Sequence, residues 1–444
     1  VRTPPAADLL PFALEAAVRE DALVLAPSLS AAGLLAARLR RQGVRVAEVP
    51  RDWAQAAAGG CVAVGARAGA WAPRPRLGAV LVLDEGDEVY QEERAPTWNA
   101  RDVAIERARR AGVPCVLTSA HPSLEALAVP GAELLAPSRA DERAGWPVVE
   151  VVDRRHEPPG SGLYSSRLVT LVREAGPDRR VVCVLNRKGR ASLLACVACG
   201  ELARCEVCTG PVADAGSGVL GCRRCGATRP AVCTACGATR MKALRVGVTR
   251  AREELELLAG RPVAEVTGDD DGGGPGRVPD APVLVGTEAV LHRVAGAHAV
   301  AFLDFDQELL APRHTAGEQA LALLARAARL VGGRDGGRLL VQTRLPGHEV
   351  LDAAVHADPS RFALVESARR AALRMPPETA LAVASGAAAA AFVEGVVGPD
   401  VEVLGPSDGK WLVRAPDHPA LADALAAAAR PPGRLRVEVD PRRV

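Results

Sequence analysis

Short apolar runs alternate with amphipathic Ala/Leu/Arg stretches along the first third of the chain. The runs at 22–27, 60–66, 78–85 and 112–120 are apolar at successive positions, as expected for strands that are buried on both faces. Between them, Ala31–Gln42 and Arg101–Ala111 have the spacing of helices. This alternation predicts a parallel sheet that is covered by helices on both sides.

A second series of apolar runs follows and is interrupted once. The runs lie at 148–153, 180–186, 282–287, 299–306 and 338–343, and a cysteine-rich stretch separates Asn186 from about Arg245. Residues 268–277 read as a loop, and the segment after Arg344 is Ala-rich and ends in a predicted strand at 433–441. We therefore predict an α/β lobe at 1–147, a second at 148–345 with an inserted module at 192–242, and a small α+β domain at 346–444.

The interrupting stretch contains four Cys-x-x-Cys pairs, which predict two four-cysteine zinc sites. The pairs are Cys196/Cys199, Cys205/Cys208, Cys222/Cys225 and Cys233/Cys236. A tight turn brings each pair of thiols to one zinc ion, and a second turn completes the tetrahedron. Gly follows three of the pairs directly and follows the second pair one residue later, at Gly210, where we expect it to accept a positive φ. A disulfide framework is disfavoured in a chain that shows no secretion signal.

The spacing of the pairs favours a nested arrangement, although four pairs can be matched in three ways. Only five residues separate the first two pairs, which is short for a hairpin, whereas thirteen separate the second and third. This predicts an inner zinc between pairs two and three and an outer zinc between pairs one and four. We expect the metal to supply folding energy, because the module has almost no apolar core. Cys61, Cys115 and Cys183 lie in apolar runs and read as core residues.

Charge is nearly balanced over the whole chain but not over the module. There are 55 Lys and Arg against 53 Asp and Glu. From Asn186 to Arg250, eleven basic and three acidic residues give +8, and two tetrathiolate zinc sites at −2 each would leave +4. A residual charge of +4 is suited to contact with phosphate groups. The alternative is that these residues simply form a solvated charged surface. With no apolar run of eighteen residues and no signal peptide, we expect a cytoplasmic protein without a membrane segment.

Two α/β lobes of similar size suggest a nucleotide-driven motor, whose chemistry is expected at the strand ends. Asp84 and Glu85 follow one run, where an acidic pair would hold Mg²⁺. Gly286 and Thr287 follow another, and Arg329 is a candidate γ-phosphate contact. A phosphate loop needs a Gly-rich turn that ends in Lys-Ser/Thr. The chain has three lysines, and none stands in such a loop; in GPSDGKW (405–411), Trp replaces the hydroxyl residue.

Several longer motifs resemble the family of primosomal protein N′, the bacterial replication-restart helicase. They are YQEERAPTWNARDVA (90–104), VLNRKGRA (184–191), the eight-cysteine array, FLDFDQELLAPRHTAGEQ (302–319) and RLRVEVDP (434–441). The resemblance covers essentially the whole chain and implies two RecA-like lobes with a double zinc ribbon inserted in the second. It also implies the nested pairing, with Cys196, Cys199, Cys233 and Cys236 on one zinc and Cys205, Cys208, Cys222 and Cys225 on the other.

The departures from the family pattern all affect nucleotide chemistry. The Gly-Lys-Thr phosphate motif falls near Thr3-Pro4-Pro5, where prolines supply neither the Lys charge nor N–H donors. Three further family motifs are altered in this chain. The family's Asp-Glu-Glu-His is DEGD at 84–87, its Ser-Ala-Thr is SAH at 119–121, and its Lys-Gly is HR at 292–293. The paired-Arg motif keeps only Arg329. These losses predict that ATP hydrolysis is gone and that nucleotide residues are vestigial.

The resemblance thus implies a replication-restart protein that binds branched or forked DNA and scaffolds a primosome, with zinc as cofactor and ATP/Mg²⁺ doubtful. Its expected partners are single-strand DNA-binding protein and primosome or helicase-loading proteins, at the nucleoid. Candidate DNA contacts are Arg187, Lys188, Arg190, Arg223 and Arg224. Two alternatives stay open: an active ATP-dependent 3′-5′ helicase, in which Asp84 and Glu85 matter, and a zinc-ribbon interaction protein that does not bind DNA.

Overall fold

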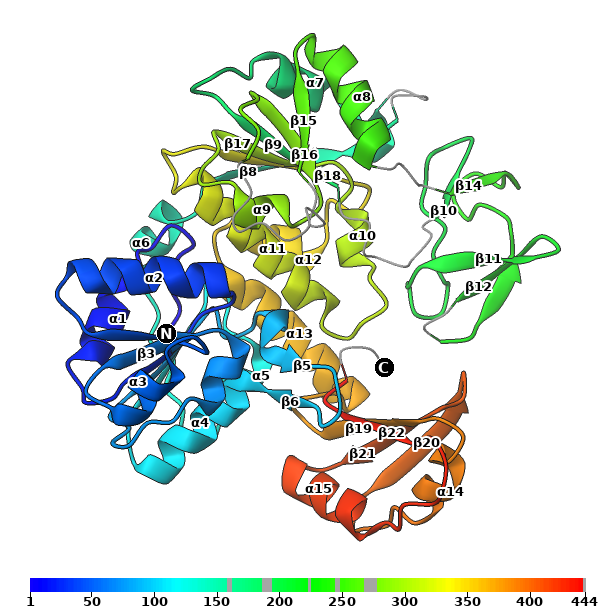
Figure 1. The fold of residues 1–444 in the computed structure, drawn as a ribbon. Helices are drawn as coiled ribbons and strands as arrows, with labels where there is room; N and C mark the ends of the chain where they lie inside the picture. Colours follow the sequence, from blue (N-terminus) through cyan, green and yellow to red (C-terminus); the bar gives the residue numbers. More distant parts are fainter. Residues whose placement is uncertain (158–161, 186–193, 223–224, 244–247, 267–277, 442–444) are drawn as a thin grey trace. The chain divides into compact units, whose positions relative to one another are not determined.

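The computed structural model describes residues 1–444 except 158–161, 186–193, 223–224, 244–247, 267–277 and 442–444 (Figure 1). The described chain divides into two compact units. The first unit holds residues 1–3, 8–136 and 363–444, and the second holds 4–7 and 137–362.

The first unit contains the first predicted parallel sheet. Its strand order is β2-β3-β1-β4-β7, and every pairing in it is parallel. Apolar clusters cover both faces of this sheet, which is why its sequence runs are continuously hydrophobic. The strands are β1 (Leu23–Leu25), β2 (Val46–Val49), β3 (Val62–Gly65), β4 (Val80–Leu83) and β7 (Cys115–Thr118). Four of them match predicted strands, whereas β2 was not predicted.

The helices of this lobe are α1 (Leu10–Ala17), α2 (Leu29–Arg41), α3 (Trp53–Ala58), α4 (Ala100–Ala111) and α5 (Leu124–Leu127). The two predicted helices are α2 and α4, each within two residues of its predicted bounds. Side-chain caps fix where they begin, because Ser28 accepts the N–H of Ala31 and Asn99 accepts the N–H of Arg101. Short 3₁₀ turns, η1 (Arg67–Trp71) and η2 (Glu88–Tyr90), and a small hairpin, β5 (Gln91–Glu92) with β6 (Trp98–Asn99), complete the lobe.

The same unit contains the predicted α+β domain. Four antiparallel strands in the order β20-β21-β19-β22 carry α14 (Ala389–Glu394) and α15 (His418–Ala427) against one apolar cluster. The strands are β19 (Ala380–Ser385), β20 (Glu402–Ser407), β21 (Lys410–Ala415) and β22 (Arg436–Val439). GPSDGKW forms the β20–β21 hairpin, with positive φ at Asp408 and Gly409. It therefore has no strand-to-helix context for a phosphate loop.

The second unit contains the second parallel sheet, with the strand order β15-β16-β9-β17-β18-β8. Its strands are β8 (Val148–Asp153), β9 (Val181–Val184), β15 (Val263–Val266), β16 (Val283–Gly286), β17 (Ala299–Phe302) and β18 (Arg338–Thr343). β15 was not predicted. The helices are α6 (Arg139–Ala144), α7 (Ser166–Arg173), α8 (Val248–Ala259), α9 (Val290–Arg293), α10 (Asp306–Leu309), α11 (Ala316–Val331) and α12 (Glu349–Val355), while α13 (Pro359–Leu373) crosses the boundary between the units.

The cysteine module lies between β9 and α8, as an insertion in the second lobe (green in Figure 1). It consists of β10 (Leu194–Cys196) paired with β14 (Met241–Ala243), and a three-stranded sheet of β11 (Val212–Gly216), β12 (Val219–Cys222) and β13 (Thr228–Pro230). The predicted fold class is therefore confirmed, whereas the exact domain boundaries stay predictions. None of the described helices is long and apolar enough to cross a bilayer.

A buried ion pair holds three loops together at one end of the first sheet. The side chains of Arg74 and Asp21 are both fully buried and lie 3.2 Å apart. Arg74 also donates to the carbonyls of Asp21 and Ala56, and Asp21 accepts the backbone N–H of Gly60 and of Arg76. The pair thus satisfies most of the polar groups of these buried turns.

Replacing Arg74 by Met should lower the free energy of unfolding by about 3–5 kcal/mol, because it leaves Asp21 buried without its counter-charge. Urea unfolding followed by circular dichroism measures this. Arg76→Met is the matched control: its side chain is 69% exposed and pairs with Glu20 at the surface, so its cost should stay below about 1 kcal/mol. Equal costs for the two variants would show that the Arg74 pair has no special role.

Candidate metal centres and candidate nucleotide residues

Each of the four Cys-x-x-Cys segments folds into the same backbone turn. In the first, the N–H of Gly200 donates to the carbonyl of Cys196 at 3.0 Å, and the N–H of Cys196 donates to the carbonyl of Glu201 at 2.8 Å. The pairs that begin at Cys205, Cys222 and Cys233 repeat both bonds at 2.8–3.0 Å. The repeated turn presents its two thiols to one point, which is the arrangement that a tetrahedral metal requires.

The second turn differs from the sequence prediction at one residue. Gly200, Gly226 and Gly237 have φ between +73° and +76°, as expected of the residue after the second cysteine. In the second turn this conformation belongs to Thr209 (φ +57°), and not to Gly210 as predicted. The Thr209 hydroxyl donates to the carbonyl of Cys208 at 2.7 Å. A local hydrogen bond therefore accompanies a conformation that is otherwise costly for a β-branched residue.

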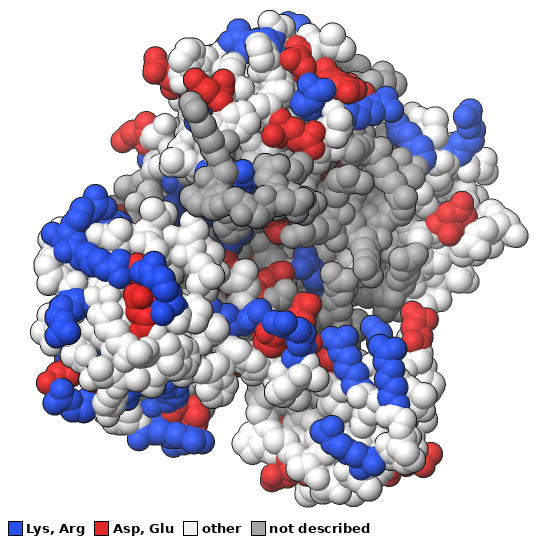
Figure 2. All heavy atoms as spheres, in the orientation of Figure 1, with Lys and Arg blue, Asp and Glu red and all other residues white. Residues whose placement is uncertain are grey.

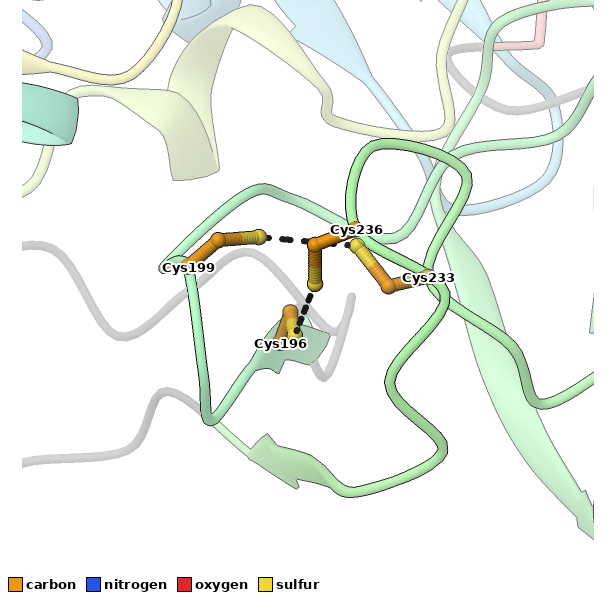
Figure 3. Close-up of side chains that lie close together, drawn as sticks. All are labelled: Cys196, Cys199, Cys233 and Cys236. Carbon is orange, nitrogen blue, oxygen red and sulfur yellow. Dashed lines mark hydrogen bonds between the residues drawn. The ribbon is translucent and has the colours of Figure 1, made fainter.

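The eight sulfur atoms form two groups with the predicted nested pairing. In the outer group, Cys196 lies 3.6 Å from Cys236 and Cys199 lies 3.6 Å from Cys233, as Figure 3 shows. In the inner group, the distances are 3.5 Å for Cys205 to Cys225 and for Cys208 to Cys222. Within each group, all sulfur atoms lie within 4.8 Å of one another.

These distances fit a metal and do not fit disulfides. A disulfide bond is about 2.05 Å long. Four sulfur atoms at about 2.3 Å from a central zinc ion would be about 3.8 Å apart along each edge of the tetrahedron. The observed edges of 3.5 and 3.6 Å are close to that value. Each group can therefore hold one zinc ion, and all-sulfur coordination is typical of structural zinc and leaves no open position for catalysis.

Against the effect of burial, backbone N–H groups lower the pKa of one cysteine in each group to about 7, Cys196 in the outer group and Cys205 in the inner group. The N–H of Cys208 points at the sulfur of Cys205 and, together with the N–H of Val207 at 3.4 Å, lowers the pKa of Cys205 to about 7, whereas burial acts in the opposite direction. A thiolate is the form that binds a metal. Around the inner site, Leu194, Ala203, Val212 and Leu220 form a small apolar cluster, so the module has somewhat more core than we predicted.

The second acid of the first lobe's pair is engaged in structural contacts. Asp84, the first acid, directly follows β4 and has φ +49°. Glu85 is buried, accepts the N–H and the hydroxyl of Ser123 at 2.8 Å each, and lies 3.4 Å from Arg101. Burial raises the pKa of Glu85, and Arg101 counteracts that shift. Because Ser123 caps α5, this carboxylate joins β4, α4 and α5.

The other predicted nucleotide residues are likewise in structural contacts. Thr3 is buried, and its N–H donates to the carbonyl of Ser119 at 2.9 Å, just after the end of β7. A Cβ on Gly286 would lie 2.2 Å from the carbonyl of Val266, so this glycine is needed for strand packing. The carbonyl of Thr287 accepts the N–H of Val290. Arg329 lies on α11 and donates to the carbonyl of Pro5 at 3.2 Å.

The five predicted DNA contacts, Arg187, Lys188, Arg190, Arg223 and Arg224, lie outside the described residues.

The structure does reveal a feature that sequence reasoning did not single out, a buried pair of acids at the carboxyl end of β17. Burial raises the pKa of Asp304, and burial together with the nearby Asp304 raises that of Asp306 to about 7. The sequence signal that could have revealed this pair is the presence of two acids within the apolar run AVAFLDFD.

Comparison with known proteins identifies relatives over most of the chain, although no family model matches it. Replication restart protein PriA of Treponema pallidum is 32% identical over 339 residues, which are 71% of this chain and 50% of that protein. The probable replication restart protein PriA of Mycobacterium tuberculosis is 30% identical over 82% of this chain and 59% of its own length. The PriA protein of Bacillus subtilis is 28% identical over 78% and 47%, respectively.

The chain thus spans about half the length of the curated relatives it matches. Among solved structures, Dbp5 of S. cerevisiae bound to RNA and ADP BeF3 is similar at a TM-score of 0.43 and 13% identity, covering 79% of this chain and 81% of that one. That likeness is too weak to carry any functional argument.

The two sulfur groups predict two zinc ions per chain, lost one at a time. Cys236→Ser should remove the outer ion and Cys225→Ser the inner ion, because each leaves only three thiols. Native mass spectrometry counts the bound metal. Cys115→Ser, a change in β7 at a cysteine that belongs to neither sulfur group, should keep both ions. Loss of both ions from each variant would contradict two separate sites.

Proposed function

Because the chain belongs to the replication restart protein PriA family, we propose that it acts in replication restart by binding branched or forked DNA and supporting primosome assembly, without ATP-driven unwinding. In this proposal, the two cysteine groups hold structural zinc. Single-strand DNA-binding protein and helicase-loading proteins are the proposed partners. Arg187, Lys188, Arg190, Arg223 and Arg224 remain proposed phosphate contacts.

The observation that carries the loss of turnover is the environment of Glu85. A motor needs this carboxylate to face Mg²⁺ or the attacking water. Here both carboxylate oxygens are taken up by Ser123 and Arg101 in a buried setting. No lysine stands among residues 1–22 to hold a β- or γ-phosphate. An acid that serves a buried structural role is what we expect once nucleotide binding is no longer required.

Support for contact with single-stranded DNA comes from an exposed tryptophan in the first lobe, Trp71, which packs against the partly buried Trp98. The rings of Trp71 and Trp98 are 5.4 Å apart and meet edge to face, and Trp71 is 55% exposed. Arg107 donates to the carbonyls of Ala70 and Ala72 on either side of Trp71, which fixes its backbone. A rigid, exposed aromatic ring suits base stacking, which does not depend on sequence.

Basic side chains on the same lobe support a phosphate contact less well. Figure 2 shows Lys and Arg side chains over the region of α2, with acidic side chains among them. Arg38 pairs with Asp8 at 2.7 Å, and Arg40 pairs with Glu48. Paired charges attract phosphate weakly, because the acid cancels much of the field of the arginine. We therefore place the proposed DNA contact of this lobe at Trp71 and not on α2.

We predict that the full-length, zinc-loaded protein shows no ATP hydrolysis above background, with or without forked DNA. A coupled phosphate-release assay measures turnover, and binding of the same DNA is followed by fluorescence anisotropy. DNA bound without turnover would support a scaffold. DNA-stimulated turnover that Asp84→Asn abolishes would instead identify a working helicase, and absence of DNA binding would favour a zinc-ribbon interaction protein.

Trp71→Ala should weaken binding of a fork with a single-stranded arm by about 1–3 kcal/mol, the usual value of one base stacked on an aromatic ring. The salt dependence of binding should stay unchanged, because stacking releases no counterions. Trp53→Ala is the matched control, since Trp53 is similarly exposed (40%) on α3. If both variants bind like the wild type, or if the salt dependence changes, Trp71 does not stack on DNA.

A further inference from the structure

The first cysteine turn is held by a residue of the second lobe. Arg344 directly follows β18, and its Nε donates to the carbonyl of Gly200 at 3.1 Å. Gly200 closes that turn, because its own N–H donates to the carbonyl of Cys196. The side chain of Arg344 is only 11% exposed. A guanidinium from the lobe therefore binds the backbone of the outer metal site directly.

Arg344 is itself held in place by a buried acid. Its backbone N–H lies 3.0 and 3.1 Å from the two carboxylate oxygens of Asp306, and its guanidinium lies 3.7 Å from the same group. Asp306 has no exposed surface and also accepts the hydroxyl of Thr343. The orientation of Arg344 toward Gly200 is thus set by the carboxyl ends of β17 and β18, because a buried charge pair tolerates little displacement.

Apolar contacts bring the same two parts together. Leu310 and Leu345 of the lobe pack against Ala195 and Leu202 of the module. Ala195 is fully buried and precedes Cys196, and Leu202 is 4% exposed and follows the first turn. The hydrogen bond from Arg344 therefore lies beside a small apolar contact, where partial exclusion of water strengthens it.

The inner site is supported differently. Cys205 and Cys222 pack with Val212 and Leu220, which belong to the module. A second arginine links the two sites, since Arg229 donates to the carbonyl of Arg204 at 3.1 Å and to that of Val232 at 2.6 Å. The outer site thus has a contact to the lobe through Arg344, whereas the described contacts of the inner cluster come from the module.

We propose that Arg344 is a positioning residue for the outer metal site, and that it couples metal occupancy there to order at the carboxyl end of β17 and β18. A bound ion fixes Cys196 and Cys199, and with them the carbonyl of Gly200. Without the ion, this turn relaxes, Arg344 loses its acceptor and Asp306 loses part of its compensation. Thermodynamic linkage makes the coupling reciprocal, so loss of Arg344 weakens retention of the ion.

This inference rests on the proposed zinc content, and the two can fail separately. A wild-type protein that binds no metal would contradict the proposed zinc sites. A protein that binds two ions but holds the outer one equally well without Arg344 would contradict the coupling alone.

The test is the rate at which a chromogenic chelator removes zinc from proteins with one site left. The Cys225→Ser protein keeps the outer site and the Cys236→Ser protein keeps the inner site. Adding Arg344→Ala should speed release from the outer site about tenfold, in the range expected for loss of a residue that supports metal ligands, and should leave the inner site unchanged. Arg338→Ala, at the exposed start of β18, is the matched control and should change neither rate.

Two further variants separate geometry from charge. Arg344→Lys keeps the positive charge but cannot bind Gly200 and Asp306 with one planar group, so it should release zinc nearly as fast as Arg344→Ala. Asp306→Asn should also speed release, and combining it with Arg344→Ala should add little, because both act through one contact. Wild-type behaviour of the Lys variant, or full additivity of the double variant, would overturn the proposed geometry.

Hydrogen exchange on the intact protein tests the coupling from the other side and does not require single-site variants. Removing zinc should raise exchange at 304–309 and 343–345 in the wild type. In Arg344→Ala the same segments should exchange rapidly whether or not zinc is present. If zinc removal leaves these segments of the wild type unchanged, the lobe does not sense the metal and the proposal is wrong.

Discussion

The fold of the inserted module depends on one constraint, that eight sulfur atoms meet in two groups of four. Six residues make up its apolar cluster, and two of these are cysteines, Cys205 and Cys222. Such a cluster cannot balance the conformational entropy of some fifty residues. The repeated turn, with its two backbone hydrogen bonds, brings the thiols of each pair together, and the nested pairing then fixes which strands meet. We therefore expect metal binding and folding of this module to be one event.

Under the proposed loss of turnover, the candidate nucleotide residues would have taken on structural roles. A carboxylate poised for Mg²⁺ must stay accessible and poorly compensated, which costs stability. Glu85 instead caps a helix through Ser123 and pairs with Arg101. Gly286 likewise serves close strand packing. Each contact stabilises its own lobe, so both lobes could keep their fold without bound nucleotide.

The sequence predicted the parts of this structure that have a strong local signal. Continuous apolar runs located most strands of both sheets, and Cys spacing located both sulfur groups. The strands β2 and β15 were not predicted, because each carries a glutamate, Glu48 or Glu265, within only four residues. The positive φ at Thr209 was not predicted either, because we assigned it to Gly210, whereas the repeated turn requires it of the residue that follows the second cysteine. Likewise, the Arg344–Gly200 contact joins residues that are 144 positions apart.

An inserted module keeps a fixed position on its host lobe only if noncovalent contacts hold it there, because relative motion of linked domains is otherwise expected. Here, the contact consists of few apolar residues and one arginine that binds a backbone carbonyl. A carbonyl is a suitable target only if its position is fixed, and Gly200 owes its position to the neighbouring metal turn. The hydrogen bond from Arg344 is therefore expected to hold only while this turn is ordered. Under the proposed coupling, order at this edge of the second lobe would depend on metal bound in the module.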